Sequence, residues 1–357
     1  MKKNAILFVV TALIVILIIY LESMKADSEK ADIENKPIEK AVEVAEEMLK
    51  EGKYPKAPEL TGISGYLNTD KEIKISDYKG KVVLIDFWTY TCINCIRTLP
   101  YLTSWDEKYR DKGLVIIGVH TPEFEFEKEK ENVLDAMEKY GIKYYVVQDN
   151  DYQTWRAYKN KFWPRKYLID SEGYIRYDHI GEGGYEETEM KIQELLSEIG
   201  EDISDMQTEK EETEFRLQTT PELYAGAGFA IPRGQFLGNA ETGFNLGEVN
   251  TYTLPEEIKR DTIYLEGEWQ YNEDNLRFTG NGQGAIVLDF TASEVNIVAD
   301  SLTDKEIEME IYINDKLIST VKVDKPQLYN VYDGEYVNAK LKLELSDEFS
   351  FNAFTFG

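Results

Sequence analysis

The sequence predicts an α/β layered domain followed by an all-β sandwich domain, with a single membrane helix ahead of both. Three observations support this. Apolar strand-like runs alternate with helix-like segments between residues 54 and 200, apolar–polar alternation of period two appears after residue 217, and an almost unbroken apolar run occupies residues 5–21. We therefore expect five segments: a transmembrane signal anchor (1–21), a charged stalk with an amphipathic helix (22–53), the α/β domain (54–200), an acidic linker (201–216) and the β-sandwich (217–357).

The N-terminal apolar run is nearly long enough to cross a membrane as a helix. Residues 5–21 are apolar except for Thr11 and Tyr20. At about 1.5 Å per helical residue they nearly span a hydrocarbon core of about 30 Å. Lys2 and Lys3 precede the run, so the positive-inside rule places the N-terminus in the cytoplasm and the rest of the chain outside. A cleaved signal peptide is the alternative, although residues 21–26 (LESMKA) form a poor cleavage site.

The charge balance excludes one class of partner. The chain has 40 Lys and Arg residues against 67 Asp and Glu residues, which gives a net charge of −27. Nucleic acid is therefore not expected as a partner, because binding to phosphates needs net basic surface. The hydrophobic content of 42% is enough for buried cores.

The elements of the α/β domain follow from its apolar pattern. A continuous apolar run predicts a covered strand over residues 82–88, and the helix expected over residues 92–112 contains Pro100, which should kink or break it. The other predicted strands are 114–119, 142–147, 166–170 and 174–180, and the other predicted helices are 127–140, 151–161 and 186–199. A turn at residues 171–173 (SEG) makes the last two strands antiparallel.

The C-terminal region has the pattern of half-buried strands. Residues 305–313 place Ile307, Met309, Ile311 and Ile313 on one face, and residues 340–345 alternate in the same way. A tight turn at residues 314–316 (NDK) and glycine-rich breaks at 226–247 and 280–284 separate the strands. These signals predict an all-β sandwich.

The two cysteines of the chain, Cys92 and Cys95, follow the strand over residues 82–88 directly. A loop this small stabilises a fold little, and no further cysteine is present to complete a metal site. Cys92 would lie in the first turn of the next helix, where unpaired N–H groups favour a thiolate. We therefore expect Cys92 to attack a disulfide and Cys95 to resolve the mixed disulfide.

Asp86 is a carboxylate within the apolar strand that leads to the cysteines. Burying it costs free energy unless it is paired or functional, and desolvation should raise its pKa. It could then accept the proton of Cys95 when that thiol attacks. The alternative is an inert, hydrogen-bonded Asp at the end of a strand.

These residues resemble a known family. The pattern DFWxxxCxxC over residues 86–95 resembles the active-site strand and helix of thioredoxin, and residues 57–60 (APEL) and 75–81 (ISDYKGK) are similar to the TlpA/ResA-like redoxin branch. Residues 87–101 (FWTYTCINCIRTLPY), 118–124 (GVHTPEF) and 163–170 (WPRKYLID) resemble the thioredoxin domain of DipZ-type cytochrome c biogenesis proteins. The likeness extends to residues 220–224 (TPELY) and 353–357 (AFTFG).

The resemblance implies a thioredoxin fold and thiol–disulfide exchange with protein substrates. Pro164 matches the cis-proline that faces the dithiol, Trp163 precedes it, and Trp88 matches the tryptophan packed under the active site; we assign all three to the substrate groove. No cofactor beyond a redox-active Cys92–Cys95 disulfide and no metal are implied. DipZ-type proteins carry a multi-helix membrane domain, whereas this chain has one apolar run, so a separate membrane electron donor is expected.

Several alternatives remain at this stage. The region 217–357 resembles the carbohydrate-binding-module-like domain of DipZ-type proteins. A docking or structural role is expected for it ahead of sugar binding, and a glycan or protein ligand is the alternative. The sugar-stacking candidates, which core or rim packing would equally explain, are Trp269, Tyr271, Tyr329, Tyr332 and Tyr336. His120 could tune Cys92 or contact substrate, or it could be structural. A copper- or other metal-handling role, peroxide reduction, and a binding module that uses the thioredoxin fold only as a scaffold are the competing functions.

Overall fold

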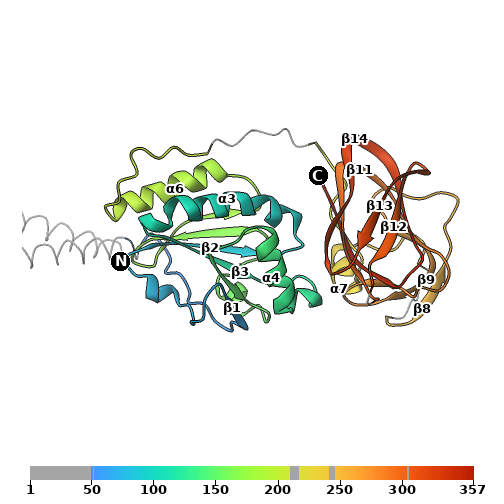
Figure 1. Cartoon of the computed structure of the whole chain (residues 1–357), viewed down its shortest axis with the longest axis horizontal. Helices are drawn as coiled ribbons and strands as arrows, with labels where there is room; N and C mark the ends of the chain where they lie inside the picture. Colours follow the sequence, from blue (N-terminus) through green and yellow to red (C-terminus); the bar gives the residue numbers. More distant parts are fainter. Residues whose placement is uncertain (1–49, 51, 210–216, 241–245, 304) are drawn as a thin grey trace, which may run out of the picture.

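The computed structural model describes residues 50, 52–209, 217–240, 246–303 and 305–357, which form two domains (Figure 1). The predicted membrane anchor, nearly all of the predicted stalk and half of the acidic linker lie outside the described residues. No helix in the described ranges is both long and apolar enough to cross a bilayer.

The α/β domain is built on a six-stranded sheet with the order β1-β4-β3-β2-β5-β6. Its strands are β1 (Gly65–Leu67), β2 (Val82–Trp88), β3 (Leu114–His120), β4 (Tyr145–Gln148), β5 (Arg165–Ile169) and β6 (Ile175–Ile180). Strands β2, β3 and β4 are parallel, and β5 and β6 are antiparallel as predicted. Sequence reasoning missed β1, because three residues are too few to show a period.

Helices cover both faces of this sheet. They are α3 (Ile93–Tyr109), α4 (Lys130–Lys139), α5 (Gln153–Ala157) and α6 (Tyr185–Glu198), with short 3₁₀ turns η1 (Ile75–Tyr78), η2 (Arg110–Lys112) and η3 (Glu125–Lys128). The expected break at Pro100 does not occur, since α3 runs through it. Leu99 and Leu102 on either side of Pro100 are buried in the core and hold the helix against the sheet.

The alternation along β2 decides which side chains lie beneath α3. Leu84 and Trp88 pack with residues of α3, α4 and α6, whereas Ile85 and Phe87 pack with α5 and the segment around η1. Because side chains of a strand alternate between faces, Asp86 points to the same side as Leu84 and Trp88. The carboxylate that sequence reasoning singled out therefore lies on the sheet face that α3 covers.

The β domain contains one continuous nine-stranded sheet, with the order β13-β12-β14-β11-β15-β10-β9-β8 and β7 paired with β15. Its strands are β7 (Leu223–Tyr224), β8 (Val249–Tyr252), β9 (Tyr264–Tyr271), β10 (Leu276–Phe278), β11 (Gly284–Ser301), β12 (Ile307–Ile313), β13 (Lys316–Val323), β14 (Gln327–Leu345) and β15 (Phe349–Phe356). A short helix α7 (Ala227–Ala230) and a turn η4 (Ile231–Arg233) follow β7.

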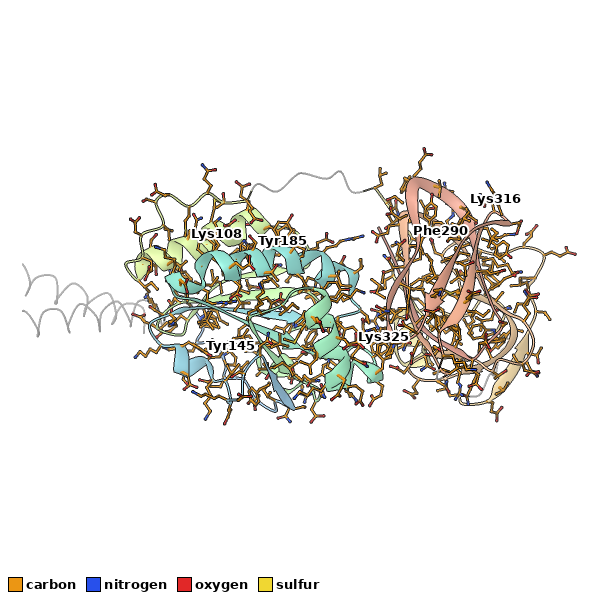
Figure 2. All side chains as sticks on the ribbon, in the orientation of Figure 1. Lys108, Tyr145, Tyr185, Phe290, Lys316 and Lys325 are labelled. Atoms are coloured by element: carbon orange, nitrogen blue, oxygen red, sulfur yellow. The ribbon has the colours of Figure 1, made fainter. Side chains whose placement is uncertain are left out.

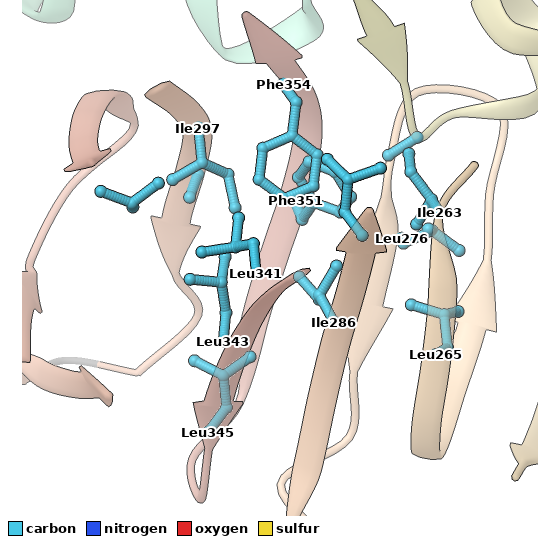
Figure 3. Packing of buried hydrophobic residues seen from close by; sticks show 14 of the residues in the cluster. Ile263, Leu265, Leu276, Ile286, Ile297, Leu341, Leu343, Leu345, Phe351 and Phe354 are labelled. Atoms are coloured by element: carbon cyan, nitrogen blue, oxygen red, sulfur yellow. The ribbon is translucent and has the colours of Figure 1, made fainter. Parts of the chain in front are cut away.

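This sheet folds back on itself around an apolar core, so the strands of the expected all-β domain are joined in one continuous sheet. Strand β11 pairs with β9 through its first residues and with β15 through its last, and bulges in its pairing with β14 let it bend. Side chains such as Leu343, Ile286 and Phe351 fill the space enclosed by the strands (Figure 3). The predicted turn after β12 is confirmed, with Asn314 and Asp315 at φ of 51° and 65°.

The two domains pack against each other at the end of the α/β domain where β2 and β3 finish. Phe124, which follows β3, forms an apolar cluster with four residues of the β domain: Tyr224, Ala230, Val298 and Ala353. Ion pairs also join the two domains, with Lys325 bound to Asp135 at 2.7 Å and Arg97 bound to Glu294. Figure 2 shows Lys325 at the boundary between the domains, whereas Lys316 lies on the far side of the β domain.

Candidate active site

The dithiol lies at the start of α3. Cys92 caps the helix, and its Sγ accepts a hydrogen bond from the backbone N–H of Cys95 with an N···S distance of 3.4 Å. Both cysteines are free thiols; Cys92 is partly exposed and Cys95 is buried. Only Cys92 is therefore accessible to a large substrate, which is the asymmetry that an attacking and a resolving cysteine need.

Cys95 is held in its protonated form. Burial raises the pKa of its thiol well above the usual value, and the hydrogen bond to Cys92 and the negative charges of Cys92 and Asp86 add to this rise. A thiol with a raised pKa is a weak nucleophile at neutral pH, because the thiolate is the reactive species. Attack by Cys95 consequently needs a nearby base.

Asp86 has the properties of such a base. Its side chain is 1% exposed, and neither carboxylate oxygen has a hydrogen-bond partner among the described residues. Burial raises the pKa of Asp86 to about 7, while the charge of Lys166 acts in the opposite direction. A carboxylate with this pKa can both accept and return a proton at neutral pH.

The Trp163–Pro164 peptide bond, which joins α5 to β5, is cis, as the resemblance implied. The indole N–H of Trp163 donates to the carbonyl of Thr121 at 3.0 Å. The centres of the Trp163 and Trp155 rings are 4.2 Å apart. Trp163 is half-buried, so part of it faces solvent. These contacts fix the orientation of the residue that we expect to line the substrate groove.

Comparisons with known proteins agree with this geometry. The family model named Redoxin matches residues 52–196, and the one described as "Thioredoxin like C-terminal domain" matches residues 220–357. The thiol-disulfide oxidoreductase ResA of Bacillus subtilis is 30% identical over 175 residues, which are 49% of this chain and 85% of ResA. The chain belongs to the redoxin family of thioredoxin-like thiol–disulfide oxidoreductases.

Two further relatives show which parts are shared. Protein DipZ of Mycobacterium tuberculosis is 39% identical over 247 residues, which are 68% of this chain but 34% of DipZ, so the chain spans about a third of that relative's length. The thiol-disulfide oxidoreductase YkuV of Bacillus subtilis is 28% identical over 143 residues, which are 40% of this chain and 94% of YkuV. The expected membership of the redoxin family and the likeness to DipZ are thereby confirmed.

Trp88 is packed in the core beside Cys95, as the resemblance implied, and it does not itself line an accessible groove. It is fully buried, and its ring meets His120 edge-on at 5.2 Å. Strand alternation turns it toward the helices on the same face as Asp86, where it packs in one cluster with Cys95. Trp88 therefore supports the dithiol from below.

Lys166 is a site residue that sequence reasoning missed. It lies directly opposite Asp86 in the pairing of β2 with β5, and it is equally buried. Its ammonium group donates to the carbonyl of Gly181 at 3.4 Å and lies 5.5 Å from the centre of the Tyr185 ring. A charged residue within a predicted buried strand was the available signal, the same one that identified Asp86.

His120 lies in the core of the α/β domain and is not placed to contact a substrate. It is completely buried, stacks on Tyr90 at 5.7 Å, and its Nε2 lies 3.4 Å from Thr89 Oγ1. Burial lowers the pKa of His120 to about 3. The ring is therefore neutral at physiological pH and cannot touch a substrate.

Most aromatic candidates for sugar stacking are not accessible. Trp269, Tyr271 and Tyr329 are buried, because they face the interior of the β domain, whereas Tyr336 is 40% exposed. The part of the chain that the structure describes holds no group of three or more His, Cys, Asp or Glu side chains placed to bind a metal ion.

Proposed function

We propose that the protein is a membrane-anchored, extracytoplasmic thiol–disulfide oxidoreductase that exchanges disulfides with protein substrates through Cys92 and Cys95. One observation carries the proposal. An accessible cysteine caps a helix, and a buried partner cysteine lies on the same sheet face as Asp86, a carboxylate that accepts no hydrogen bond from any described residue.

The first step forms a mixed disulfide. The thiolate of Cys92 attacks one sulfur of a substrate disulfide, an S–S bond forms between Cys92 and the substrate, and the other substrate sulfur leaves as a thiolate. The N-cap position supports this step, because the backbone N–H of Cys95 in the first turn of α3 donates to the Cys92 sulfur, and the positive end of the helix dipole favours a thiolate there.

The second step releases the substrate. Cys95 passes its proton to Asp86, its thiolate attacks the sulfur of Cys92, and the second substrate sulfur leaves as a thiolate that takes up a proton. Two electrons have then moved to the substrate, and the enzyme holds a Cys92–Cys95 disulfide. A dithiol donor must reduce it again, and we propose a separate membrane protein for that task. The same steps in reverse oxidise a substrate dithiol.

The substrate is proposed to bind as an extended segment beside Trp163 and Pro164. Trp163 is partly exposed and held by its bond to Thr121, so it offers a fixed surface near Cys92. Proteins with an accessible disulfide fit this groove, and an apocytochrome with an oxidised cysteine pair is one example. The β domain is proposed to bind a protein or glycan ligand.

An assay of disulfide reduction with insulin or an oxidised peptide tests the function. The wild-type chain should turn over, Cys92→Ser should be inactive, and Cys95→Ser should accumulate the mixed disulfide at Cys92. No turnover by the wild type, or equal turnover by Cys92→Ser, would refute the proposal. Copper or zinc bound in stoichiometric amount to the reduced but inactive protein would favour the metal-handling alternative.

The reduction potential of the Cys92–Cys95 pair gives the direction of electron flow. A reduction potential of about −270 mV would indicate a reductant, and one of about −120 mV would indicate an oxidant. Residues Ile93 and Asn94 separate the cysteines, so the potential cannot be carried over from thioredoxin.

A further inference from the structure

A buried carboxylate, Glu127, joins the dithiol turn to the loop on which the β domain packs. Glu127 lies in η3 and is fully buried. Its Oε1 accepts a hydrogen bond from Thr91 Oγ1 at 2.5 Å, and its Oε2 accepts the backbone N–H groups of Glu123 at 2.5 Å and Phe124 at 2.9 Å. Glu127 accepts all three hydrogen bonds. Its carboxylate therefore joins the turn that carries Thr91 to the turn that carries Glu123 and Phe124.

On one side of Glu127 lies the reactive cysteine. Thr91 directly precedes Cys92, the N-cap of α3, and Thr91 is itself buried. A displacement of Thr91 would change the direction in which the Cys92 sulfur meets the N–H groups of the helix. Because those N–H groups stabilise a thiolate, the nucleophilicity of Cys92 depends on how this turn is held.

On the other side lies the β domain. The two residues whose N–H groups bind Glu127 are the ones whose side chains the β domain holds. Tyr224 Oη lies 2.7 Å from Glu123 Oε1 and 2.9 Å from Glu222 Oε2. Phe124 inserts its ring into the apolar cluster between the domains, 5.7 Å from the ring of Phe229.

The same loop also touches the substrate groove. The carbonyl of Thr121 accepts the bond from Trp163, and Thr121 Oγ1 lies 3.4 Å from Asp149 Oδ2. Residues 121–128, which we name the docking loop, therefore contact the dithiol turn, the groove and the β domain at once.

We propose that docking of the β domain sets the reactivity of Cys92 through Glu127, a positioning residue that joins the docking loop to Thr91. The β domain is then a part of the active site and not an independent binding module. A ligand of the β domain that changes the contact at Tyr224 would change the rate at which Cys92 attacks. This inference deepens the proposed function and rests on Cys92 being the attacking thiol.

A double-mutant cycle tests the connection. Thr91→Val removes the hydroxyl on the dithiol side, and Tyr224→Phe removes the hydroxyl on the side of the β domain. The reduced full-length chain is treated with iodoacetamide, and the alkylation rate of Cys92 is measured as a function of pH. Each single variant should shift the pH midpoint by about half a unit, equivalent to about threefold in rate below the midpoint. Tyr224→Phe should have no additional effect in the Thr91→Val background.

The control is Tyr312→Phe. This residue also donates its phenolic O–H to a carboxylate of the same domain, Glu310 at 2.7 Å. It lies on β12 and pairs with Leu317, next to Lys316, on the side of the β domain away from the docking loop (Figure 2). It should leave the alkylation profile unchanged. Circular dichroism and thermal unfolding of each variant establish that it is folded.

Two results would overturn the proposal: additive effects of Thr91→Val and Tyr224→Phe, or an alkylation profile in Tyr224→Phe that equals that of the wild type. Alkylation needs no disulfide substrate and no electron donor. An inactive wild-type chain in the insulin assay would therefore contradict the proposed function but would not test whether Tyr224 affects Cys92. Likewise, a negative alkylation result would contradict the link through Glu127 but not the proposed function.

Discussion

The two domains bury very different side chains. Among the described residues, every charged side chain that is buried lies in the α/β domain: Asp86, Asp106, Glu127, Asp149, Lys166, Asp170 and Glu189. The core of the β domain consists of apolar residues, and the polar side chains buried there are uncharged. Burial of a charge costs free energy, so the α/β domain must compensate its buried charges with partners or use them in its chemistry, whereas the core of the β domain has no such cost.

The buried carboxylates of the α/β domain also differ among themselves. Asp170 pairs with Arg176 at 3.2 Å, Glu189 pairs with Lys108 at 2.5 Å, and Asp149 accepts the backbone N–H of Trp155 at 2.7 Å. Asp86 has no hydrogen-bond partner among the described residues. Partnered carboxylates stabilise the fold, whereas an unpartnered one destabilises it and calls for a functional reason.

The largest expected effect is on stability, and it depends on pH. Below about pH 4, Asp86 is protonated in the folded and the unfolded chain. Between that pH and about 7, only the unfolded chain releases the proton, because burial raises the folded pKa from 3.8 to about 7. The wild type should therefore lose stability relative to Asp86→Asn as pH rises, by up to about 4 kcal/mol above pH 7.

Chemical denaturation of the reduced proteins at several pH values measures this difference. Asp170→Asn is the matched control, because its carboxylate is paired, and it should be less stable than the wild type at neutral pH. A difference between Asp86→Asn and the wild type that does not change with pH would contradict an elevated pKa for Asp86.

The next effect concerns the β domain. Leu343→Ala removes a fully buried side chain from its core (Figure 3) and should lower the free energy of unfolding by about 3 kcal/mol. At temperatures where the variant stays folded, its alkylation profile at Cys92 should match that of the wild type, since the docking loop is untouched. A shifted profile would mean that the two cores are coupled more widely than through the docking loop.

The proton transfer gives the third prediction. Asp86→Asn should slow the attack of Cys95 on a mixed disulfide by about 100-fold, because general base catalysis is lost. The attack of Cys92 on the substrate should be nearly unchanged. Rapid-mixing kinetics with a Cys92 mixed disulfide separates the two steps, and equal slowing of both would remove Asp86 from the proton pathway.

The smallest effect is expected for Lys166→Met. Loss of this charge removes the contribution that lowers the pKa of Asp86, so the pH profile of the Cys95 step should move to higher pH. At neutral pH the rate should fall by about threefold. A profile that stays at the wild-type pH would show that Lys166 does not act on Asp86.

Local sequence patterns were sufficient to predict the positions of Asp86 and Cys92. The apolar run of β2 placed Asp86 in a covered strand, and the position of Cys92 just after that strand placed it at a helix start. Both properties depend on residues fewer than ten positions apart, where periodicity and capping rules apply. The likeness to known families supplied the cis peptide bond before Pro164, which no local rule predicts.

The contacts of Lys166 and Glu127 depend on pairing between segments that are distant in sequence. Lys166 meets Asp86 only through the register of β5 against β2, and Glu127 meets Thr91 only because the docking loop turns back after β3. Trp88 was grouped with the groove residues because it matches the tryptophan packed under the active site of the family, and its strand face directs it into the core beside Cys95.

The sequence by itself determined the reactive pair, the strand that carries Asp86 and the division into an α/β and a β region, because these follow from short-range periodicity and from residue type. Only the tertiary structure decided that the β domain packs beside the dithiol, with Tyr224 bound to Glu123 and Arg97 bound to Glu294. Those contacts join residues about 100 to 200 positions apart, and their free energy depends on the shapes of two folded surfaces, which no short sequence window contains.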